Sequence, residues 1–314
     1  MLSFLLPMSY VAIAREEAAV VERTGLLGEG GVWAGRQVVA RFFIEGFGNA
    51  EQRITWLPQL ASVAISEPRV GAHPKLLTTR AEEDGDGYCI FGEKAWVSNG
   101  PLAEVFIVFA VTAVVEGRKR YSAFLVPRDT LGLSINEAAE YRALAPSRHC
   151  GLRLDGCRVP RSAMLGPPGA AYETMALPFR DVEDAVGTFG LVGAFRFVLS
   201  RFAQQCSASD EAVLSLGRLA ALTAVFAETA EVVVDALDAG ELPRCASALV
   251  GLRVLATDML QRARAHRDAF CPAGDDATER TFGDLDVSLS VARGPRTARQ
   301  ARLGSELIAA AARA

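Results

Sequence analysis

The most constraining feature of this chain is its middle, where aromatic and β-branched residues dominate from Gly87 to Pro127. Residues of these types favour pleated strands with one buried face. Asp84-Gly-Asp-Gly87 has the composition of a tight turn, and Glu116-Gly-Arg-Lys-Arg120 that of a charged hairpin tip. The stretch therefore predicts several strands in a compact β unit.

Helical patterns lie on both sides of this β unit. Before Ser66, apolar residues recur every three or four positions over Glu16–Thr24 and Gly35–Phe47. Asn49 and Gln52 have the spacing of a capping box that starts a short helix. Strands that follow one another without intervening helices argue against a doubly wound sheet, so the sequence predicts an α+β fold.

Long helices are expected after Glu173. The amphipathic, alanine- and leucine-rich runs are Phe189–Gln204, Glu211–Ala239 and Leu242–Phe270, followed by a basic helix over Arg293–Ala314. Gly240 is placed to close one helix and Pro243 to open the next. Helices of this length pack into an antiparallel bundle.

The composition limits the possible function classes. Half of the 314 residues are hydrophobic, which is enough for a substantial core, and the net charge is −4 with a pI near 5.6. The short Arg118–Arg120 cluster is the only basic run, so no nucleic-acid partner is expected.

The apolar start, Met1–Ala14, has no positive region before it and is shorter than the roughly 20 residues of a membrane span. We interpret it as a core helix, with a signal peptide as the alternative. We therefore expect a cytoplasmic protein without a membrane span.

No metal site is expected from the spacing of cysteines and histidines. The cysteines are far apart and form no C-x-x-C pair, which favours reduced thiols. They are Cys89, Cys150, Cys157, Cys206, Cys245 and Cys271. The histidines, which also lack metal-ligand spacing, are His73, His149 and His266.

Several short motifs occur in a fixed order between about Phe42 and Leu199. They are Glu51-Gln-Arg53, Trp56-Leu-Pro-Gln-Leu60, Ala64-Ile-Ser-Glu-Pro68, Gly92-Glu-Lys-Ala-Trp-Val-Ser-Asn-Gly100, Phe124-Leu-Val-Pro127 and Asp155-Gly-Cys-Arg-Val-Pro160. Together they resemble the acyl-CoA dehydrogenase family, although each alone is a weak signal. The resemblance implies a truncated N-terminal helical domain over 1–62, a central β-barrel-like domain over 63–168 and a C-terminal helical bundle over 169–314.

The same resemblance implies that FAD lies between the β domain and the C-terminal helices. Contacts with it are expected from Ile65, Ser66, Gly71, Trp96, Val97 and Ser98. In the family pattern Ser66 reaches the pyrimidine edge of the flavin, Trp96 packs near its dimethylbenzene side and Ser98 points toward N5. Such hydrogen bonds tune an electron-accepting ring. The alternative is that Trp96 is a core aromatic and both serines are turn residues.

The chain departs from the family pattern beside this cofactor. Where the family has G-A-G-S-D, this chain has Arg69-Val-Gly-Ala-His73, so a hydroxyl is lost at Ala72. Arg69 is placed either to bind a pyrophosphate or to be a solvated surface residue. The glycine-rich element that reaches the adenosine diphosphate part of FAD corresponds only to the segment Cys271–Arg280. FAD binding is therefore expected to be weak or to depend on a partner.

The catalytic base is also altered. Removal of the α-proton of an acyl thioester needs a carboxylate, and the two positions that supply it in the family align with Arg293 and Arg180. Arginine cannot act as a base. Asp181, Glu183 and Asp184 are close enough to Arg180 that a shift of one turn would supply a carboxylate, and Asp181 and Glu183 are the candidates. Their alternative role is as charges at the helix N-terminus.

Two functions follow from the resemblance. One is FAD-dependent α,β-oxidation of an acyl-CoA or other acyl thioester, with electrons passed to an electron-transfer flavoprotein. The other is a non-catalytic subunit that pairs with a full-length homologue, which would explain the lost base and the altered cofactor loop together. In either case a homo-oligomer or heteromer is expected, because the long helices exceed what one thin bundle can bury. A different flavin reaction, such as hydroxylation, has no residue of its own to support it.

Overall fold

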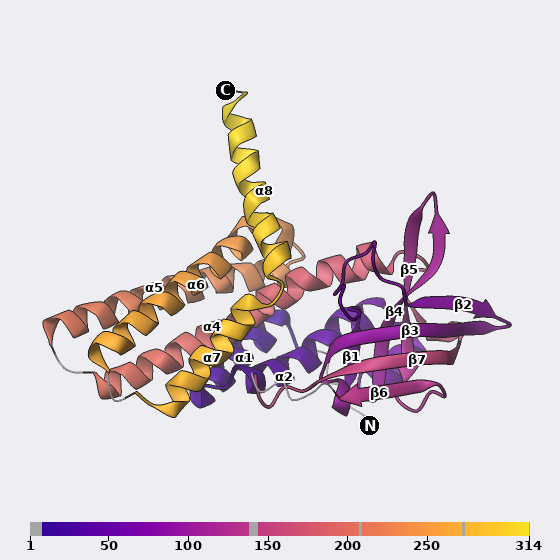
Figure 1. Cartoon of the computed structure of the whole chain (residues 1–314), viewed down its shortest axis with the longest axis horizontal. Helices are drawn as coiled ribbons and strands as arrows, with labels where there is room; N and C mark the ends of the chain where they lie inside the picture. The colour runs from indigo at the N-terminus through magenta and orange to yellow at the C-terminus, as the bar shows by residue number, and fades with distance from the viewer. Residues whose placement is uncertain (1–7, 138–143, 207–208, 272–273, 314) are drawn as a thin grey trace. The chain divides into compact units, whose positions relative to one another are not determined.

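The computed structural model describes residues 8–137, 144–206, 209–271 and 274–313 (Figure 1). The chain divides into two compact units. The sheet unit comprises Met1–Met8, Gly35–Arg142 and Pro146–Glu183, and the helical unit comprises Ser9–Ala34, Ala143–Ala145 and Asp184–Ala314. Strands gather in one unit and long helices in the other, which confirms the α+β class. The three-domain division at residues 62 and 168 stays a prediction.

The sheet unit contains one mixed sheet. Its strands are β1 (Ala61–Ala64), β2 (Arg80–Asp84), β3 (Gly87–Ser98), β4 (Val105–Val115), β5 (Arg118–Pro127), β6 (Leu133–Glu137), β7 (His149–Pro160) and β8 (Met164–Leu165). They are ordered β6-β7-β3-β2-β4-β5-β8, and β1 pairs in parallel with β4. The long strands β3 and β7 run antiparallel beside each other (Figure 1).

The expectation of a barrel-like sheet is wrong. Among the described strands, β6 and β8 form the two ends of the order and do not pair with each other. Closing a barrel requires tilted strands that meet edge to edge along a continuous ladder. With five residues in β6 and two in β8, the end strands are too short to provide one. The sheet is therefore open.

Turn chemistry sets the hairpins as the sequence predicts. Val115 pairs with Arg118 across the β4–β5 turn, and the central residues Glu116 and Gly117 have φ of 50° and 74°. Positive φ at both central positions is the type I′ geometry, whose twist matches that of the flanking strands.

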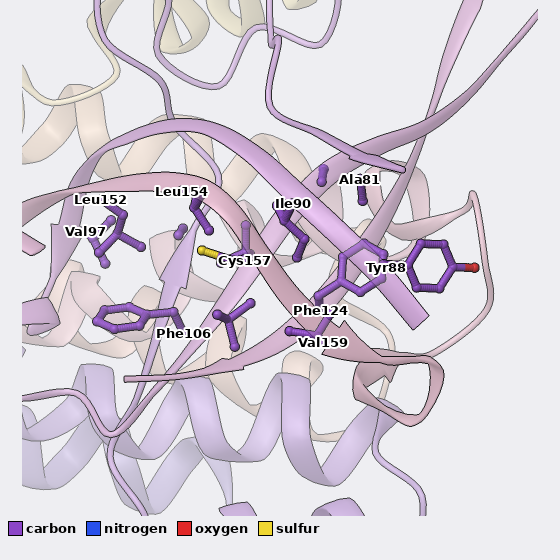
Figure 2. Packing of buried hydrophobic residues seen from close by; sticks show 14 of the residues in the cluster. Ala81, Tyr88, Ile90, Val97, Phe106, Phe124, Leu152, Leu154, Cys157 and Val159 are labelled. Atoms are coloured by element: carbon purple, nitrogen blue, oxygen red, sulfur yellow. The ribbon is translucent and has the colours of Figure 1, made fainter. Parts of the chain in front are cut away.

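The core of the sheet unit is built from alternate residues of its strands. Figure 2 shows Ile90 of β3, Phe106 of β4, Phe124 of β5 and Leu154 of β7 among the packed side chains. Phe106 and Phe124 are completely buried. Burial of each such ring stabilises the fold by roughly 2 to 3 kcal/mol, as an upper estimate.

Short helices flank the sheet within the same unit. They are the π-helix η1 (Ala40–Glu45), α3 (Ala50–Trp56), η2 (Gly100–Leu102), η3 (Arg161–Ala163) and the π-helix η4 (Tyr172–Ala176). The predicted capping box of α3 is confirmed, because the amides of Asn49 and Gln52 each donate to the other's side-chain oxygen at 2.9 Å. The Gln52 side chain also donates to the carbonyls of Ser162 and Met164, which ties α3 to the chain around β8.

The helical unit holds the long C-terminal helices together with the N-terminal one. They are α1 (Tyr10–Thr24), α5 (Asp210–Asp238), η5 (Leu242–Cys245), α6 (Ala246–Phe270), α7 (Asp276–Ser290) and α8 (Arg293–Ala311). Two further helices, α2 (Leu27–Val39) and α4 (Leu177–Gln205), begin in one unit and end in the other.

Gly240 closes α5 as predicted. It has φ of 72° and donates to the Leu237 carbonyl at 3.0 Å, while Glu241 donates to the Ala236 carbonyl at 2.7 Å. This pair of bonds is the Schellman arrangement, which needs a residue that tolerates positive φ. Pro243 then lies in the first turn of η5.

The apolar start differs from its prediction. The helix begins at Tyr10 because the Ser9 hydroxyl accepts from the Ala12 amide at 3.1 Å and so caps it. Asp238 accepts from the amides of Tyr10 and Val11, both at 2.9 Å, and joins this end to α5. Residues 1–7 of the predicted helix lie outside the described residues.

The continuous helical segment Tyr172–Gln205 is long and apolar enough to cross a membrane by length and composition alone. However, 67% of its most apolar window is buried inside the protein. Such burial is typical of a core helix.

Two glycines of α2 should respond in opposite ways to alanine. A Cβ at Gly28 would overlap the Leu144 carbonyl, whereas one at Gly31 would meet nothing within 4 Å. We expect Gly28→Ala to lower the free energy of unfolding by about 1 to 3 kcal/mol and Gly31→Ala to raise it by about 0.5 to 1 kcal/mol. Urea unfolding of both variants measures this, and equal effects would contradict the packing at Gly28.

Candidate functional site

A buried ion pair fixes the loop that follows β1. The Lys94 ammonium on β3 lies 3.1 Å from the Glu67 carboxylate, with 0% and 5% of the two side chains exposed. Lys94 also donates to the Ile65 carbonyl at 3.1 Å. This contact joins the predicted cofactor loop to the middle of the sheet.

Glu67 organises the rest of the loop through further bonds. Its carboxylate accepts from the Thr78 amide at 2.7 Å, the Thr78 hydroxyl at 2.8 Å and the Thr79 amide at 2.8 Å. Burial alone would raise the pKa of Glu67, but the Lys94 ammonium and these donors lower it to about 2. Burial lowers the pKa of Lys94 to about 8 against the attraction of Glu67, so both groups are charged at neutral pH.

Trp96 is displayed in a strained conformation beside this loop. Its φ of 59° lies in the left-handed region, and the β3–β7 register shifts between Lys94 and Val97. Such a conformation costs roughly 1 to 3 kcal/mol at a non-glycine residue and recurs at functional sites. The bulge leaves 61% of the Trp96 residue surface exposed. A core position for Trp96, the alternative considered from the sequence, is therefore wrong.

Among the predicted cofactor residues, Ser66 lies beside the segment that carries Trp96, Val97 and Ser98. The Ala95 amide donates to the Ser66 carbonyl at 2.9 Å, which places Ser66 next to Trp96. Ser98 is exposed, and Ile65 and Ser66 are half-buried. Val97 points into the core, as Figure 2 shows, so only its backbone faces this surface.

The altered loop segment is anchored from its outer side. The Tyr121 hydroxyl donates to the Pro74 carbonyl, and the Tyr172 hydroxyl donates to the Ala72 carbonyl at 2.9 Å. Burial raises the pKa of Tyr121 to about 12, so it keeps its proton. Arg69 is exposed and has φ of 68°, the left-handed region that the glycine of the family pattern adopts freely.

This surface fits a planar, hydrogen-bonding ring. It offers an exposed indole face, the hydroxyls of Ser66 and Ser98, and open space at Gly71, where a Cβ would meet nothing within 4 Å. These are donor and packing groups of the kind that an isoalloxazine requires.

The predicted carboxylates lie deeper in a helix than the sequence indicates. The π-helix η4 runs directly into α4, so Asp181 and Glu183 are more than a turn from where the helix begins. Their reading as charges at a helix N-terminus therefore loses its basis, because the dipole effect fades after the first turn. Asp181 is half-buried and Glu183 is exposed. Their catalytic role stays a prediction.

Asp184 is the centre of an arginine cluster in the helical unit. Its carboxylate lies 3.1 Å from Arg253, 3.0 Å from Arg296 and 3.7 Å from Arg299. Three guanidinium groups thus share this one carboxylate as their ion-pair partner. A basic helix is indicated by the spacing of Arg293, Arg296, Arg299 and Arg302. Only the fold shows that Arg296 and Arg299 pair with Asp184.

A groove of about 590 Å³ also lies in the sheet unit, lined by Tyr88, Thr112, Arg120, Ser122, Gly169 and Glu173 among others. None of these is a predicted site residue. Ser122 already bonds Thr112 at 3.0 Å and the Gly169 amide at 2.9 Å. The hydroxyl of Ser122, which is completely buried, is therefore already engaged.

The sequence family described as acyl-CoA dehydrogenase, middle domain, matches residues 62–157. The mitochondrial short-chain specific acyl-CoA dehydrogenase of Mus musculus is 33% identical over 133 residues, 40% of this chain and 32% of that protein. The matched part thus spans about a third of the relative's length.

Solved structures extend the likeness to nearly the whole chain. Glutaryl-CoA dehydrogenase from Mycobacterium smegmatis has a TM-score of 0.75 at 25% identity, over 90% of this chain and 76% of that one. The electron transferring flavoprotein of Acidaminococcus fermentans has a TM-score of 0.77 at 15% identity, over 96% of this chain and 99% of that one. At that identity the second match shows the fold alone.

Replacement of Lys94 tests the ion pair. Lys94→Met leaves Glu67 buried without its cation, so we expect the free energy of unfolding to fall by about 3 to 5 kcal/mol, whereas Lys75→Met at an exposed position should change little. Because the folded pKa of Glu67 is depressed, its stabilisation is complete above about pH 4.5 and is lost as the pH falls toward 2.

In the Lys94→Met variant the folded pKa of Glu67 rises, so the acid-induced loss should begin at higher pH. Urea unfolding between pH 2 and 7 measures both effects. An unchanged acid profile would show that Lys94 does not hold the charge of Glu67.

Proposed function

We propose that this chain, whose residues 62–157 match the middle domain of the acyl-CoA dehydrogenase family, is an FAD-binding flavoprotein that oxidises an acyl thioester between its α and β carbons. The observation that carries the proposal is the strained, exposed Trp96 held beside Ser66 by the Glu67–Lys94 pair. A costly backbone and an exposed indole are retained where a flat ring would cover them.

Different residues of this surface would contact different parts of the flavin ring. Ser66 and Ser98 supply hydroxyls for its polar edge, and Trp96 supplies an apolar face. The Glu67–Lys94 pair keeps these groups in place, since a loop tied to a strand loses little entropy on binding. FAD, when bound, would accept the hydride equivalent that leaves the β carbon of the thioester.

Arg69 is the residue we assign to the charged part of the cofactor. It is exposed, and its left-handed backbone costs free energy that a glycine would avoid. A guanidinium at this position can form charge-assisted bonds to a pyrophosphate. The hydroxyl that the family pattern has at Ala72 is replaced by a charge three residues earlier.

Asp181 and Glu183 remain our candidates for the base that takes the α-proton. Both lie on α4, and Glu183 is exposed. Asp184 is unsuited to this role because both of its carboxylate oxygens are engaged by arginines. Arg180 and Arg293 are exposed at the two family base positions.

A second candidate function is a non-catalytic subunit of a heteromeric acyl-CoA dehydrogenase. It is favoured by the arginines at both base positions and by the engagement of Asp184. In this case a full-length homologue supplies the base and completes the FAD site. For the catalytic function we propose an electron-transfer flavoprotein as electron acceptor and a homo-oligomer, in the cytoplasm.

The visible spectrum of the purified full chain tests flavin binding. We expect flavin absorption bands, and a FAD affinity about tenfold weaker in Trp96→Ala, because the variant loses the packing face. Trp33 is half-buried in the helical unit, so Trp33→Phe is the matched control and should bind FAD as tightly as the wild type does. A colourless chain that gains flavin only with a homologous partner supports the subunit function instead.

Substitution of the α4 carboxylates tests the base. In Glu183→Gln or Asp181→Asn, bleaching of bound flavin by an acyl-CoA should slow by about 100-fold or more while flavin stays bound. Glu173→Gln, an exposed carboxylate on η4, serves as control. Rapid bleaching in both variants would exclude these residues as the base.

A further inference from the structure

Three potential metal ligands meet in the helical unit, and none of them is among the residues assigned above. Cys206 directly follows α4, His266 lies in the last two turns of α6, and Cys271 is the residue that ends α6. One ligand atom from each residue lies within 4.8 Å of the other two. The spacing of these residues gave no sign of this, because they lie at the ends of two separate helices and only tertiary packing joins them.

The imidazole of His266 is oriented in a way that suits a metal ligand. Its Nδ1 lies 3.0 Å from the Ser215 hydroxyl of α5, and the side chain is almost completely buried. With Nδ1–H donating to Ser215, the Nε2 atom presents its lone pair. Metal-binding histidines are commonly held by such a bond at the other ring nitrogen.

Nε2 of His266 is buried and has no hydrogen-bond partner among the residues that the structure describes. A buried polar atom without a partner costs free energy and calls for a cause. The rings of Phe202 and Phe270 lie 4.8 and 5.2 Å from the imidazole, so the surroundings are apolar and fix its position. An ion bound to Nε2 would remove this cost.

The donor set determines which metal suits the cluster. Two sulfurs and one imidazole nitrogen favour zinc among the common divalent ions. Sulfurs on a tetrahedral zinc lie roughly 3.8 Å apart, given Zn–S bonds of about 2.3 Å. The observed upper limit of 4.8 Å thus requires a shift of roughly 1 Å, and both cysteines lie at helix ends, where such a shift is small.

We propose that Cys206, His266 and Cys271 form a zinc site that joins the ends of α4 and α6. On binding, the two thiols become thiolates and release their two protons to solvent, and no electrons are transferred. The fourth position belongs to water or another small ligand. Asp275 in the following segment does not supply it, because its carboxylate bonds Thr278 at 2.9 Å and Gln205 at 2.7 Å.

A disulfide between the two cysteines is the competing use of this cluster. It would leave Nε2 of His266 without a partner, whereas a metal ion satisfies all three side chains. The orientation of His266 by Ser215 therefore favours the metal.

The test uses the reduced, full-length chain after removal of metal by a chelator. Zinc should bind at about one ion per chain, and cobalt, as a spectroscopic substitute, should give thiolate-to-metal absorption and the visible bands of a tetrahedral ion. Cys206→Ser and Cys271→Ser should each weaken zinc binding by at least 100-fold, and Ser215→Ala by about 10- to 100-fold. Cys245→Ser, a buried cysteine outside the cluster, is the matched control.

If a variant does not fold, zinc binding can still be tested on the wild-type chain by its thermal stability. Excess zinc should raise its Tm by roughly 5 °C or more over the chelated form. The proposal is overturned if the reduced chain takes up neither metal at micromolar concentration, or if uptake is unchanged in both cysteine variants. These readouts need no flavin, so they stand apart from the proposed oxidoreductase function.

Discussion

The buried contact between Glu67 and Lys94 is the interaction on which the candidate flavin surface depends. An ion pair taken out of water stabilises a fold only when further hydrogen bonds satisfy both partners. Here Glu67 also accepts hydrogen bonds from the amides of Thr78 and Thr79, and Lys94 also donates to the Ile65 carbonyl. The pair therefore fixes the loop after β1 against strand β3 and sets the position of Ser66 relative to Trp96. Hydrophobic residues of similar size would not specify this position.

Local structure was predictable from the sequence because it depends on neighbouring residues. Asn49 and Gln52 form their capping box, Gly240 closes α5, and Glu116 begins the β4–β5 turn, each through contacts within a few residues. The α+β class followed from the order of strand-rich and helical segments. The motifs from Ala64 to Gly100 indicated the resemblance to acyl-CoA dehydrogenases, whose middle domain matches residues 62–157.

Long-range partners were not predictable. The sheet is open because β6 and β8, which end it, do not pair with each other. Asp184, the acid that Arg296 and Arg299 contact, lies more than 100 residues from them in the sequence. The same holds for Cys206 and His266, which share no motif spacing yet lie close together. The exposed state of Trp96 also arises from a register shift that no local pattern encodes. Each of these features is a property of packing, and composition carries little information about it.

The bulge that turns Trp96 outward has an optical consequence. Of the three indoles in the chain, those of Trp33 and Trp56 are half-buried, while Trp96 faces solvent. Solvent-facing indoles emit at longer wavelength and are open to collisional quenchers, so the red edge of the emission comes mainly from one residue. The protein thus carries its own fluorescent reporter at the surface where a ligand would settle, and occupancy there can be followed without any added label.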